Sequence, residues 1–221
     1  MRRTWVVVPL YNEAAVVGAV VAELRAVFTH VVCVDDCSTD GSGEAAAAAG
    51  AVVVRHPLNL GQGAALQTGI AFALRDHRMT SVITFDADGQ HQVSDAVAML
   101  AVLEQEGLDV VLGSRFLDER TRPPALKRLV LRAAVAYSNQ TSGVRLTDAH
   151  NGLRVLNRKT AECLEIRQNR MAHASEIVAQ IGRNGLTWRE HPVHVLYSEY
   201  SRRKGQSVLN SVNILTELLH R

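Results

Sequence analysis

The sequence predicts an α/β fold with a mostly parallel central sheet and helices on both of its faces. Short runs rich in Val, Ile and Leu alternate along the chain with helical segments, which is typical of βαβ units. Runs of this kind are expected where a parallel sheet buries its strands on both faces. Polar residues follow several of these runs directly, at the strand ends where α/β proteins bind ligands.

Length and composition fit one soluble, globular domain. The 221 residues suffice for a substantial core, and 47% hydrophobic with 21% charged residues is ordinary for such a domain. The net charge of +2 gives no field that would attract nucleic acid, so we expect no nucleic-acid partner.

Strands and helices are expected to alternate through the first half of the chain. The alanine run at 45–49 predicts a short helix, because Asp40 and Gly41 precede it and Gly50 supplies a C-cap. Each expected strand is a short run of β-branched or leucine residues. The expected strands are 4–8, 31–35, 51–55, 81–86 and 108–113, and the expected helices are 13–28, 41–49, 63–75 and 94–106.

The second half is less regular. We expect a helix over 124–139, in which basic residues stand beside leucines, a helix over 172–184 and a strand over 186–197. The segment 206–219 places leucines at helical spacing and predicts an amphipathic helix.

Cysteine use and the N-terminus indicate a cytoplasmic setting. Cys33, Cys37 and Cys163 form no C-x-x-C pair, and an odd count without a signal peptide suits a reducing compartment. Cys33 lies in an apolar run and is expected to be a buried small hydrophobe. The chain enters a strand at once, and its apolar stretches are shorter than the roughly 18 residues of a membrane span.

The most informative local feature is a strand that ends in two carboxylates. Asp86 and Asp88 stand one residue apart after the run 82–85, so both side chains leave the same side of the extended chain. Adjacent carboxylates repel each other, and a bound Mg²⁺ or Mn²⁺ would stabilise them. Such a cation commonly completes its coordination with substrate phosphates. The alternative is a solvated turn.

Other polar residues are expected at the same edge of the sheet. Because the carboxyl ends of parallel strands meet at one edge, residues that follow four different strands would converge there. These residues are Tyr11, Asn12, Glu13, Asp35, Asp36, Asp86, Asp88 and Arg115.

Five motifs occur in order and carry a resemblance to a known family. They are VVVPLYNE at 6–13, VDDCSTDGS at 34–42, NLGQGAALQTG at 59–69, FDADGQH at 85–91 and GSRF at 113–116. The chain resembles family 2 glycosyltransferases of the GT-A fold. It is most similar to the polyprenyl-phosphate sugar synthases, the dolichol-phosphate mannosyltransferase-like branch. The segments 148–154, 190–193 and 202–207 also fit that branch.

The resemblance implies a donor-binding turn after the first strand. Pro9, Tyr11 and Glu13 match that turn, where a ring and a carboxylate would hold base and ribose. The alternative is a helix start with Asn12 as N-cap. Val34 and Asp36 match positions that line the base and contact the nucleotide, with Asp35 as a further candidate. The alternative for them is a strand-to-helix turn, and Asp40 is expected to be structural.

The resemblance also implies the metal ligands. Asp88 matches a direct ligand and Gln90 an additional one, while Asp86 would contact the metal, the nucleotide sugar or both. Ala87 lies between the two carboxylates and is expected to line the donor. His91 either extends this site or is an ordinary loop histidine.

Basic residues are expected to bind phosphate. Arg115 suits this role because a guanidinium binds two oxygens at once, and a surface ion pair is the alternative. Arg202, Lys204 and Ser207 match the basic active-site loop of the family. The closest branch often has lysine after that serine, where this chain has Val208. Lys204 is the candidate to make the phosphate contact of that lysine.

A carboxylate would be needed as a base if the acceptor were a sugar hydroxyl. Asp148 matches an acidic position before the Gly-x-Arg segment and is one candidate, and Glu176 is the competing one. A lipid phosphate is already anionic and needs no strong base, in which case Asp148 serves binding or architecture.

The implied activity is inverting, metal-dependent sugar transfer from a GDP- or UDP-linked donor, with a polyprenyl phosphate as the favoured acceptor. Residues 1–221 would form one domain, with a donor-binding half at 1–116 and an acceptor-binding half at 117–221. The helices at 124–139 and 206–219 would lie on the inner face of the membrane, dock on a small membrane-protein partner, or cover the core.

Other functions remain open from the sequence. A cytoplasmic glycosyltransferase with a soluble sugar, natural-product or protein acceptor would need a base such as Asp148. A non-catalytic nucleotide-sugar-binding subunit is a further alternative, against which the intact Asp86/Asp88 pair argues. A nucleotidyltransferase would show a Gly-rich basic loop after its first strand, where this chain has Leu10-Tyr11-Asn12-Glu13. Gly61-Gln62-Gly63 does not complete the G-x-G-x-x-G motif of a dinucleotide-binding loop, because residue 66 is Leu.

Overall fold

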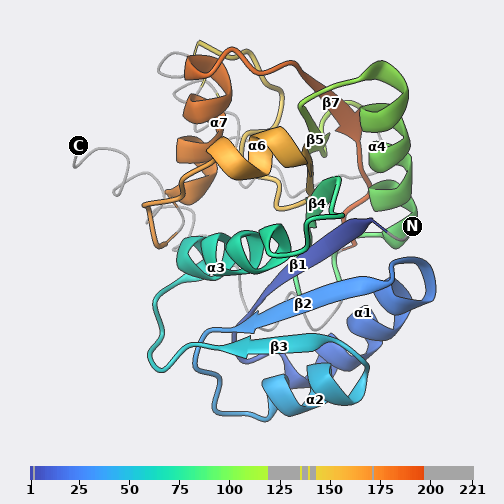
Figure 1. Cartoon of the computed structure of the whole chain (residues 1–221), viewed down its shortest axis with the longest axis vertical. Helices are drawn as coiled ribbons and strands as arrows, with labels where there is room; N and C mark the ends of the chain where they lie inside the picture. The colour runs from blue at the N-terminus through green and yellow to red at the C-terminus, as the bar shows by residue number, and fades with distance from the viewer. Residues whose placement is uncertain (2, 119–134, 136–138, 140–142, 171, 197–221) are drawn as a thin grey trace.

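The structure is a computed structural model that describes residues 1, 3–118, 135, 139, 143–170 and 172–196. Its centre is a seven-stranded sheet with the order β3-β2-β1-β4-β6-β5-β7 (Figure 1). The strands are β1 Thr4–Leu10, β2 His30–Asp35, β3 Val52–Arg55, β4 Ser81–Thr84, β5 Val110–Ser114, β6 Arg154–Asn157 and β7 Trp188–Pro192. The helices are α1 Ala14–Val27, α2 Ser42–Ala48, α3 Gln62–Leu74, α4 Val93–Glu106, α6 Arg158–Cys163 and α7 His173–Arg183.

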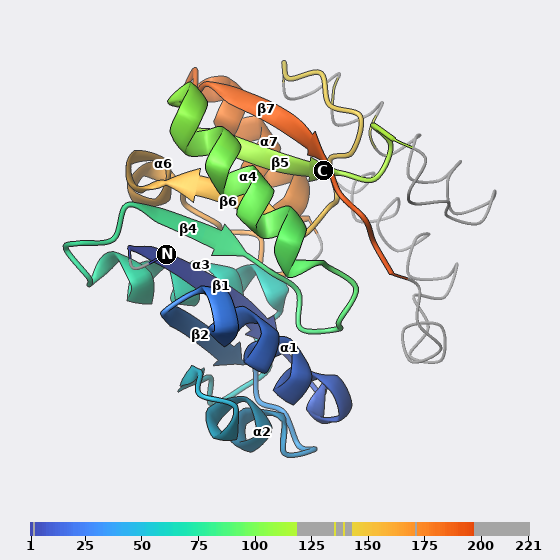
Figure 2. The ribbon, with the colours of Figure 1, turned by 90° about the vertical axis from the view of Figure 1, so that its right-hand side faces the viewer.

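The predicted mostly parallel α/β sheet is confirmed. Strands β3, β2, β1 and β4 pair in parallel, and so do β5 and β7. The exception is β6, which lies antiparallel between β4 and β5 (Figure 2). This strand and helix α6 were missing from the sequence-based expectation. The predicted helices at 124–139 and 206–219 lie outside the described residues, apart from single positions of the first.

Helices cover both faces of the sheet. Helices α1, α2 and α4 lie on one face, and α3, α6 and α7 lie on the other (Figures 1 and 2). Strand β1 shows how the sequence makes both cores, since Val6 and Val8 belong to one apolar cluster and Trp5 and Val7 to the other. Successive side chains of a strand point to opposite faces, so an unbroken apolar run fills both.

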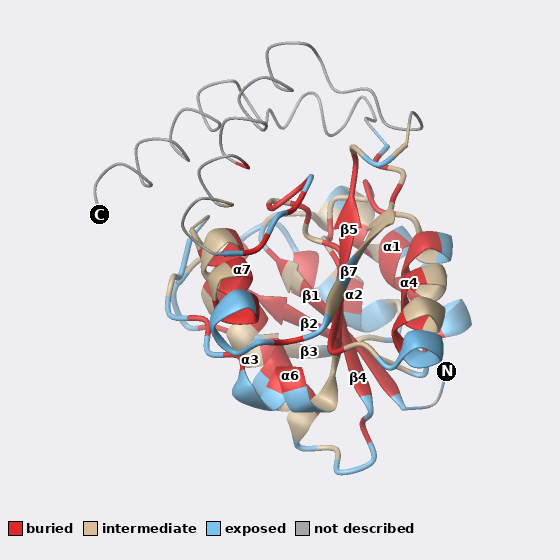
Figure 3. Cartoon of the chain, turned by 90° about the horizontal axis from the view of Figure 1, so that it is seen from above, coloured by how far each residue is buried: buried red, intermediate tan, exposed pale blue. Residues whose placement is uncertain are grey.

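The distribution of burial follows this layering. Seen from above, the central strands are buried, the edge strands β3 and β7 are partly exposed, and the outer sides of the helices are exposed (Figure 3). On α1, Val17, Val20, Val21 and Leu24 are buried at helical spacing and face the sheet. Cys33 is fully buried in β2, as predicted, and burial together with nearby Asp35 raises the pKa of its thiol to about 12.

The pairing register of the strands places their carboxyl ends side by side at one edge of the sheet. Leu10 of β1 is opposite Asp35 of β2, and Thr84 of β4 is opposite Val7. The amide of Asp36 donates to the carbonyl of Leu10, so the chain leaves β2 beside the end of β1. Thr84 is also opposite Arg154 of β6. The loops after β1, β2 and β4 therefore leave the sheet at one edge. Among the described residues, no helix is long and apolar enough to cross a membrane.

Candidate active site

Asp86 lies at the centre of a hydrogen-bonded group at the end of β4. Its Oδ2 accepts from Nε2 of His91 at 3.0 Å, and its Oδ1 accepts from Nε2 of Gln62 at 3.0 Å. Burial opposes ionisation, but the His91 hydrogen bond and the charge of Arg154 outweigh it and hold the pKa of Asp86 below its usual value. The Asp86 side chain is still 27% exposed, so the ionised carboxylate is open on one side.

Asp88 is held by the tight turn that follows. Its Oδ1 accepts from the backbone amide of Gln90 at 3.0 Å, and Gly89 between them has φ +73°. A left-handed residue is needed for the turn, and glycine adopts it without strain. Burial and the nearby charge of Asp86 raise the pKa of Asp88 to about 6. The two predicted metal-binding carboxylates thus occupy the same small region and repel each other.

The donor set fits a divalent cation. Two mutually repelling carboxylates and the buried Gln90 offer the oxygen ligands that Mg²⁺ and Mn²⁺ prefer. Within the described ranges, no three His, Cys, Asp or Glu side chains are grouped to hold a metal by themselves. A cation at Asp86 and Asp88 would therefore take its remaining ligands from Gln90, water or a diphosphate.

Arg115 and Asp148 form a bidentate ion pair inside the protein. Nε of Arg115 donates to Oδ2 of Asp148 at 2.6 Å, and Nη2 donates to Oδ1 at 2.8 Å. Arg115 therefore forms an ion pair, as in the alternative interpretation, but the pair is buried and not at the surface, since Asp148 is 2% exposed. Burial opposes ionisation of Asp148, but Arg115 outweighs it and holds the pKa of this carboxyl below its usual value. This carboxylate anchors the arginine, which is the architectural role that the sequence left open.

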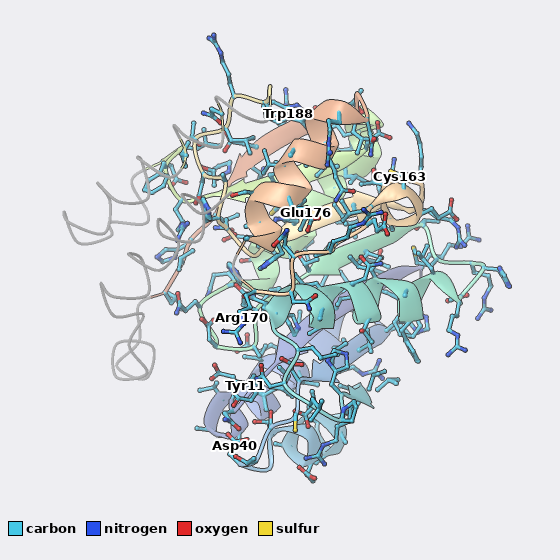
Figure 4. The ribbon with its side chains drawn as sticks, turned by 90° about the vertical axis from the view of Figure 1, so that its left-hand side faces the viewer. Tyr11, Asp40, Cys163, Arg170, Glu176 and Trp188 are labelled. Atoms are coloured by element: carbon cyan, nitrogen blue, oxygen red, sulfur yellow. The ribbon has the colours of Figure 1, made fainter. Side chains whose placement is uncertain are left out.

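Glu176 and Glu190 also support loops. Oε2 of Glu176 accepts from the amides of Arg167 and Gln168, at 3.0 and 2.8 Å, at the start of α7 (Figure 4). Glu190 accepts from the amides of Thr147 and Asp148 and so fixes the turn that carries Asp148.

The loop after β1 presents Tyr11 to solvent. Tyr11 is 48% exposed, and Figure 4 shows it in the same part of the molecule as Asp40. The alternative in which Asn12 caps α1 is wrong, because its Oδ1 accepts from the amide of Thr39 and Glu13 holds the N-cap position. Asp40 is structural, as expected, since its Oδ2 accepts from the amide of Ala14 at 3.0 Å.

Asp36 is buried and its carboxylate already accepts several hydrogen bonds. Donors are Nδ1 of His56 at 2.8 Å and the amides of Leu60 and Gly61 at 2.9 and 2.7 Å. These contacts hold the loop before α3, and a nucleotide contact of Asp36 stays a prediction. Asp35 is fully buried and accepts from the amide of Ser38 at 2.8 Å.

The remaining predicted donor contacts lie in or beside the sheet. Pro9 of β1 is opposite Val34 of β2, and Val34 is fully buried. Ala87 is 4% exposed, between the two carboxylates. The predicted roles of these residues in binding the donor stay predictions. Arg202, Lys204 and Ser207 lie outside the described residues.

Sequence reasoning missed Gln62 as a site residue. It begins α3 within Gly61-Gln62-Gly63, and the two glycines let the backbone of 168–169 approach closely. A Cβ at Gly63 would lie 2.0 Å from the carbonyl oxygen of Gln168. The glycines thus serve chain packing, and Gln62 between them reaches Asp86. For His91, the structure supports the reading in which it extends the site.

Comparison with known proteins agrees with this geometry. Residues 5–164 match the family model described as glycosyl transferase family 2. The chain belongs to glycosyl transferase family 2. Its members are transferases, and this family 2 chain has the GT-A fold. Thus the predicted family, fold and enzyme class are confirmed.

Two relatives in sequence illustrate the family, and one solved structure illustrates the fold. The chain is 34% identical to an uncharacterised protein of Methanocaldococcus jannaschii over 97% of this chain and 90% of that protein. It is 25% identical to the UDP-N-acetylglucosamine–dolichyl-phosphate N-acetylglucosaminyltransferase of Methanococcus voltae, over 97% and 94%. Glucosyl-3-phosphoglycerate synthase of Mycobacterium tuberculosis, solved with Mn²⁺, UDP and glucosyl-3-phosphoglycerate, superposes with a TM-score of 0.75 at 19% identity, over 99% and 79%.

Proposed function

We propose that this family 2 member is an inverting, metal-dependent glycosyltransferase that moves a sugar from a nucleotide diphospho-sugar to a polyprenyl phosphate. The observation that carries the proposal is the Asp86/Asp88 pair at the end of β4, held by Gln62, His91 and the turn at Gly89. The dolichyl-phosphate transferase among the relatives supports the lipid acceptor.

Asp88, with Asp86 and Gln90, would hold the divalent cation. When bound, that cation neutralises the diphosphate of the donor and stabilises it as a leaving group. Arg115 would add positive charge near the diphosphate, because the buried Asp148 keeps its guanidinium oriented. Pro9, Tyr11, Glu13, Val34, Asp36 and Ala87 would contact the nucleotide sugar, and Arg202, Lys204 and Ser207 would contact phosphate.

The state of the two proposed bases favours an acceptor that is already anionic. Asp148 is buried in its ion pair with Arg115, and Glu176 accepts from two backbone amides. Neither carboxylate is therefore available to remove a proton from a sugar hydroxyl, as a hydroxyl acceptor would require. A phosphate oxygen would attack the anomeric carbon directly from the face opposite the diphosphate, which inverts the configuration.

The two halves of the single domain would have different roles in the reaction. Residues 1–116 would bind the donor, and residues 117–221 would bind the acceptor at the inner surface of the membrane, directly or through a small membrane-protein partner. A glycosyltransferase with a soluble acceptor is the alternative function, and the experiment below separates the two.

The test is transfer of radiolabelled sugar from a panel of GDP- and UDP-linked donors with Mn²⁺ or Mg²⁺, with and without undecaprenyl phosphate. We expect metal-dependent label in the lipid fraction, lost by at least about 100-fold in Asp88→Ala, since removal of a key charge-stabilising group costs that much. Glu104→Ala on the exposed side of α4 is the matched control and should keep full activity.

Two outcomes would contradict parts of the proposal. Label that enters only soluble acceptors would refute the lipid acceptor and favour the alternative glycosyltransferase. Transfer that persists in EDTA and in Asp88→Ala would refute the metal-dependent mechanism.

A further inference from the structure

The Gly-x-Arg segment at 152–154 lies against Asp86, although neither Gly152 nor Arg154 has a role in the proposed reaction. A Cβ at Gly152 would lie 2.1 Å from Oδ2 of Asp86 and 2.6 Å from its Cγ. Favourable contacts between such atoms are about 3.5–4.0 Å. Gly152 is not among the glycines with positive φ, so its backbone would accept alanine. The carboxylate of Asp86 is therefore the obstacle to a side chain at this position.

Hydrogen bonds on both sides keep the Gly152 backbone from moving away. Oγ1 of Thr84, in β4, donates to the carbonyl of Gly152 at 2.6 Å. The amide of Gly113, in β5, donates to the carbonyl of Leu153 at 3.0 Å. The segment thus connects the two strands that lie on either side of β6 (Figure 2).

The Asp86 carboxylate is held just as firmly from its other side. Gln62 of α3 and His91 donate to its two oxygens, each at 3.0 Å. The ring of His91 is itself fixed, because it is buried and packs edge-to-face on Phe85 with 5.5 Å between centroids. A shift of the carboxylate that makes room for a methyl group at residue 152 would therefore strain or break these two hydrogen bonds.

Arg154, two residues after Gly152 and opposite Thr84 of β4, is a buried positive charge. It is 2% exposed, and its positive charge acts on both Asp86 and Asp148. Its Nη1 is closed off from solvent and has no hydrogen-bond partner among the described residues. A buried cation needs nearby negative charge, which the Asp86 and Asp148 carboxylates supply.

We propose that Gly152 is a positioning residue that fixes where the Asp86 carboxylate lies at the end of β4. Gly152 leaves the space that the carboxylate occupies. The consequence for cation binding rests on the proposed function, whereas the contact between Gly152 and Asp86 does not.

The contact is tested by a double-mutant cycle on the thermal unfolding midpoint, Tm. Gly152→Ala should lower Tm by about 5 °C, as expected for an overpacked site in a domain of this size. In the Asp86→Ala background, which removes the obstructing carboxylate, the same substitution should lower Tm by less than about 2 °C. An equal loss in both backgrounds would overturn the proposal.

Gly18→Ala is the matched control. Gly18 lies in α1, and a Cβ there would come no closer than 4.0 Å to its nearest neighbour, the carbonyl oxygen of Ala45. Alanine is favoured over glycine inside helices, so this variant should keep or raise Tm.

The effect on the cation is tested by calorimetric titration of MnCl₂ into each variant with UDP or GDP. Gly152→Ala should bind Mn²⁺ at least about tenfold more weakly than the wild type, a loss of 1.4 kcal/mol or more. Gly18→Ala should bind normally. Equal binding by wild type and Gly152→Ala would overturn the positioning role. A wild type that binds no Mn²⁺ with either nucleotide would refute the proposed function, and the Tm cycle would still decide the contact.

Discussion

At the scale of single residues, a few buried polar atoms have no hydrogen-bond partner. Among the described residues, these atoms belong to Asp35, His91, His150, Asn151, Arg154 and Ser175. Burial lowers the pKa of His150 to about 4, so this imidazole is neutral in the folded protein at physiological pH. Such a residue gives the fold a pH dependence that can be measured.

Stability should fall as the pH drops from about 6.5 to about 4. In that window the unfolded chain protonates His150 while the folded chain keeps it neutral, so protons favour unfolding. The full contribution is present above the unfolded pKa and is lost as the pH falls through the folded pKa, an effect of roughly 3 kcal/mol for the residue. Urea denaturation at several pH values should show a smaller loss over this window in His150→Asn. The same pH dependence in wild type and variant would contradict the assignment.

The ion pair between Arg115 and Asp148 gives a second prediction at this scale. Asp148→Ala should destabilise the fold by about 3–5 kcal/mol, because it leaves a buried guanidinium without its carboxylate. The double variant Arg115→Ala with Asp148→Ala should be less destabilised than the sum of the two single variants. Chemical denaturation of all four proteins measures this coupling, and additive losses would refute it.

At the scale of elements, the sequence predicts what depends on local pattern. The runs of β1, β2 and β5 and the periodicity of α1 and α4 are strong, so their positions agree with expectation within a few residues. Strand β6 has only four residues and begins with a buried arginine, and its antiparallel placement depends on pairing with Ser81–Thr84 far away in the chain. No local pattern encodes that pairing.

The candidate site was likewise predictable only where a local sequence pattern encodes it. The Asp86/Asp88 pair was predictable because a strand ending in two carboxylates is a local signal. The contacts of Gln62 and Gly152 with Asp86 were not, because they depend on how α3 and the turn before β6 pack against the end of β4. Glycine at 61 and 63 was the one available hint of close packing near Gln62.

The whole molecule should respond to its donor nucleotide as one unit. A ligand that binds only the folded state stabilises it by about 2.7 kcal/mol at a concentration 100 times its dissociation constant. For a domain of this size, the cognate nucleoside diphosphate with Mn²⁺ should therefore raise Tm by about 5 °C or more.

Thermal unfolding with GDP and with UDP identifies the base that the protein selects. Asp88→Ala should lose the rise in Tm, while Glu104→Ala should keep it. A rise of the same size in Asp88→Ala would show that the nucleotide binds without the proposed metal ligands.

The antiparallel β6 has a consequence for the order in which the chain folds during synthesis. Strands β4 and β5 do not pair with each other, because Arg154–Asn157 lies between them and pairs with both. A ribosome that has released only the first 116 residues has therefore delivered the acidic pair but not the strand that completes the sheet beside it. The proposed donor-binding half is defined by its role in binding and is not expected to fold by itself. A fragment that ends at residue 116 should therefore not reproduce the donor affinity of the intact chain.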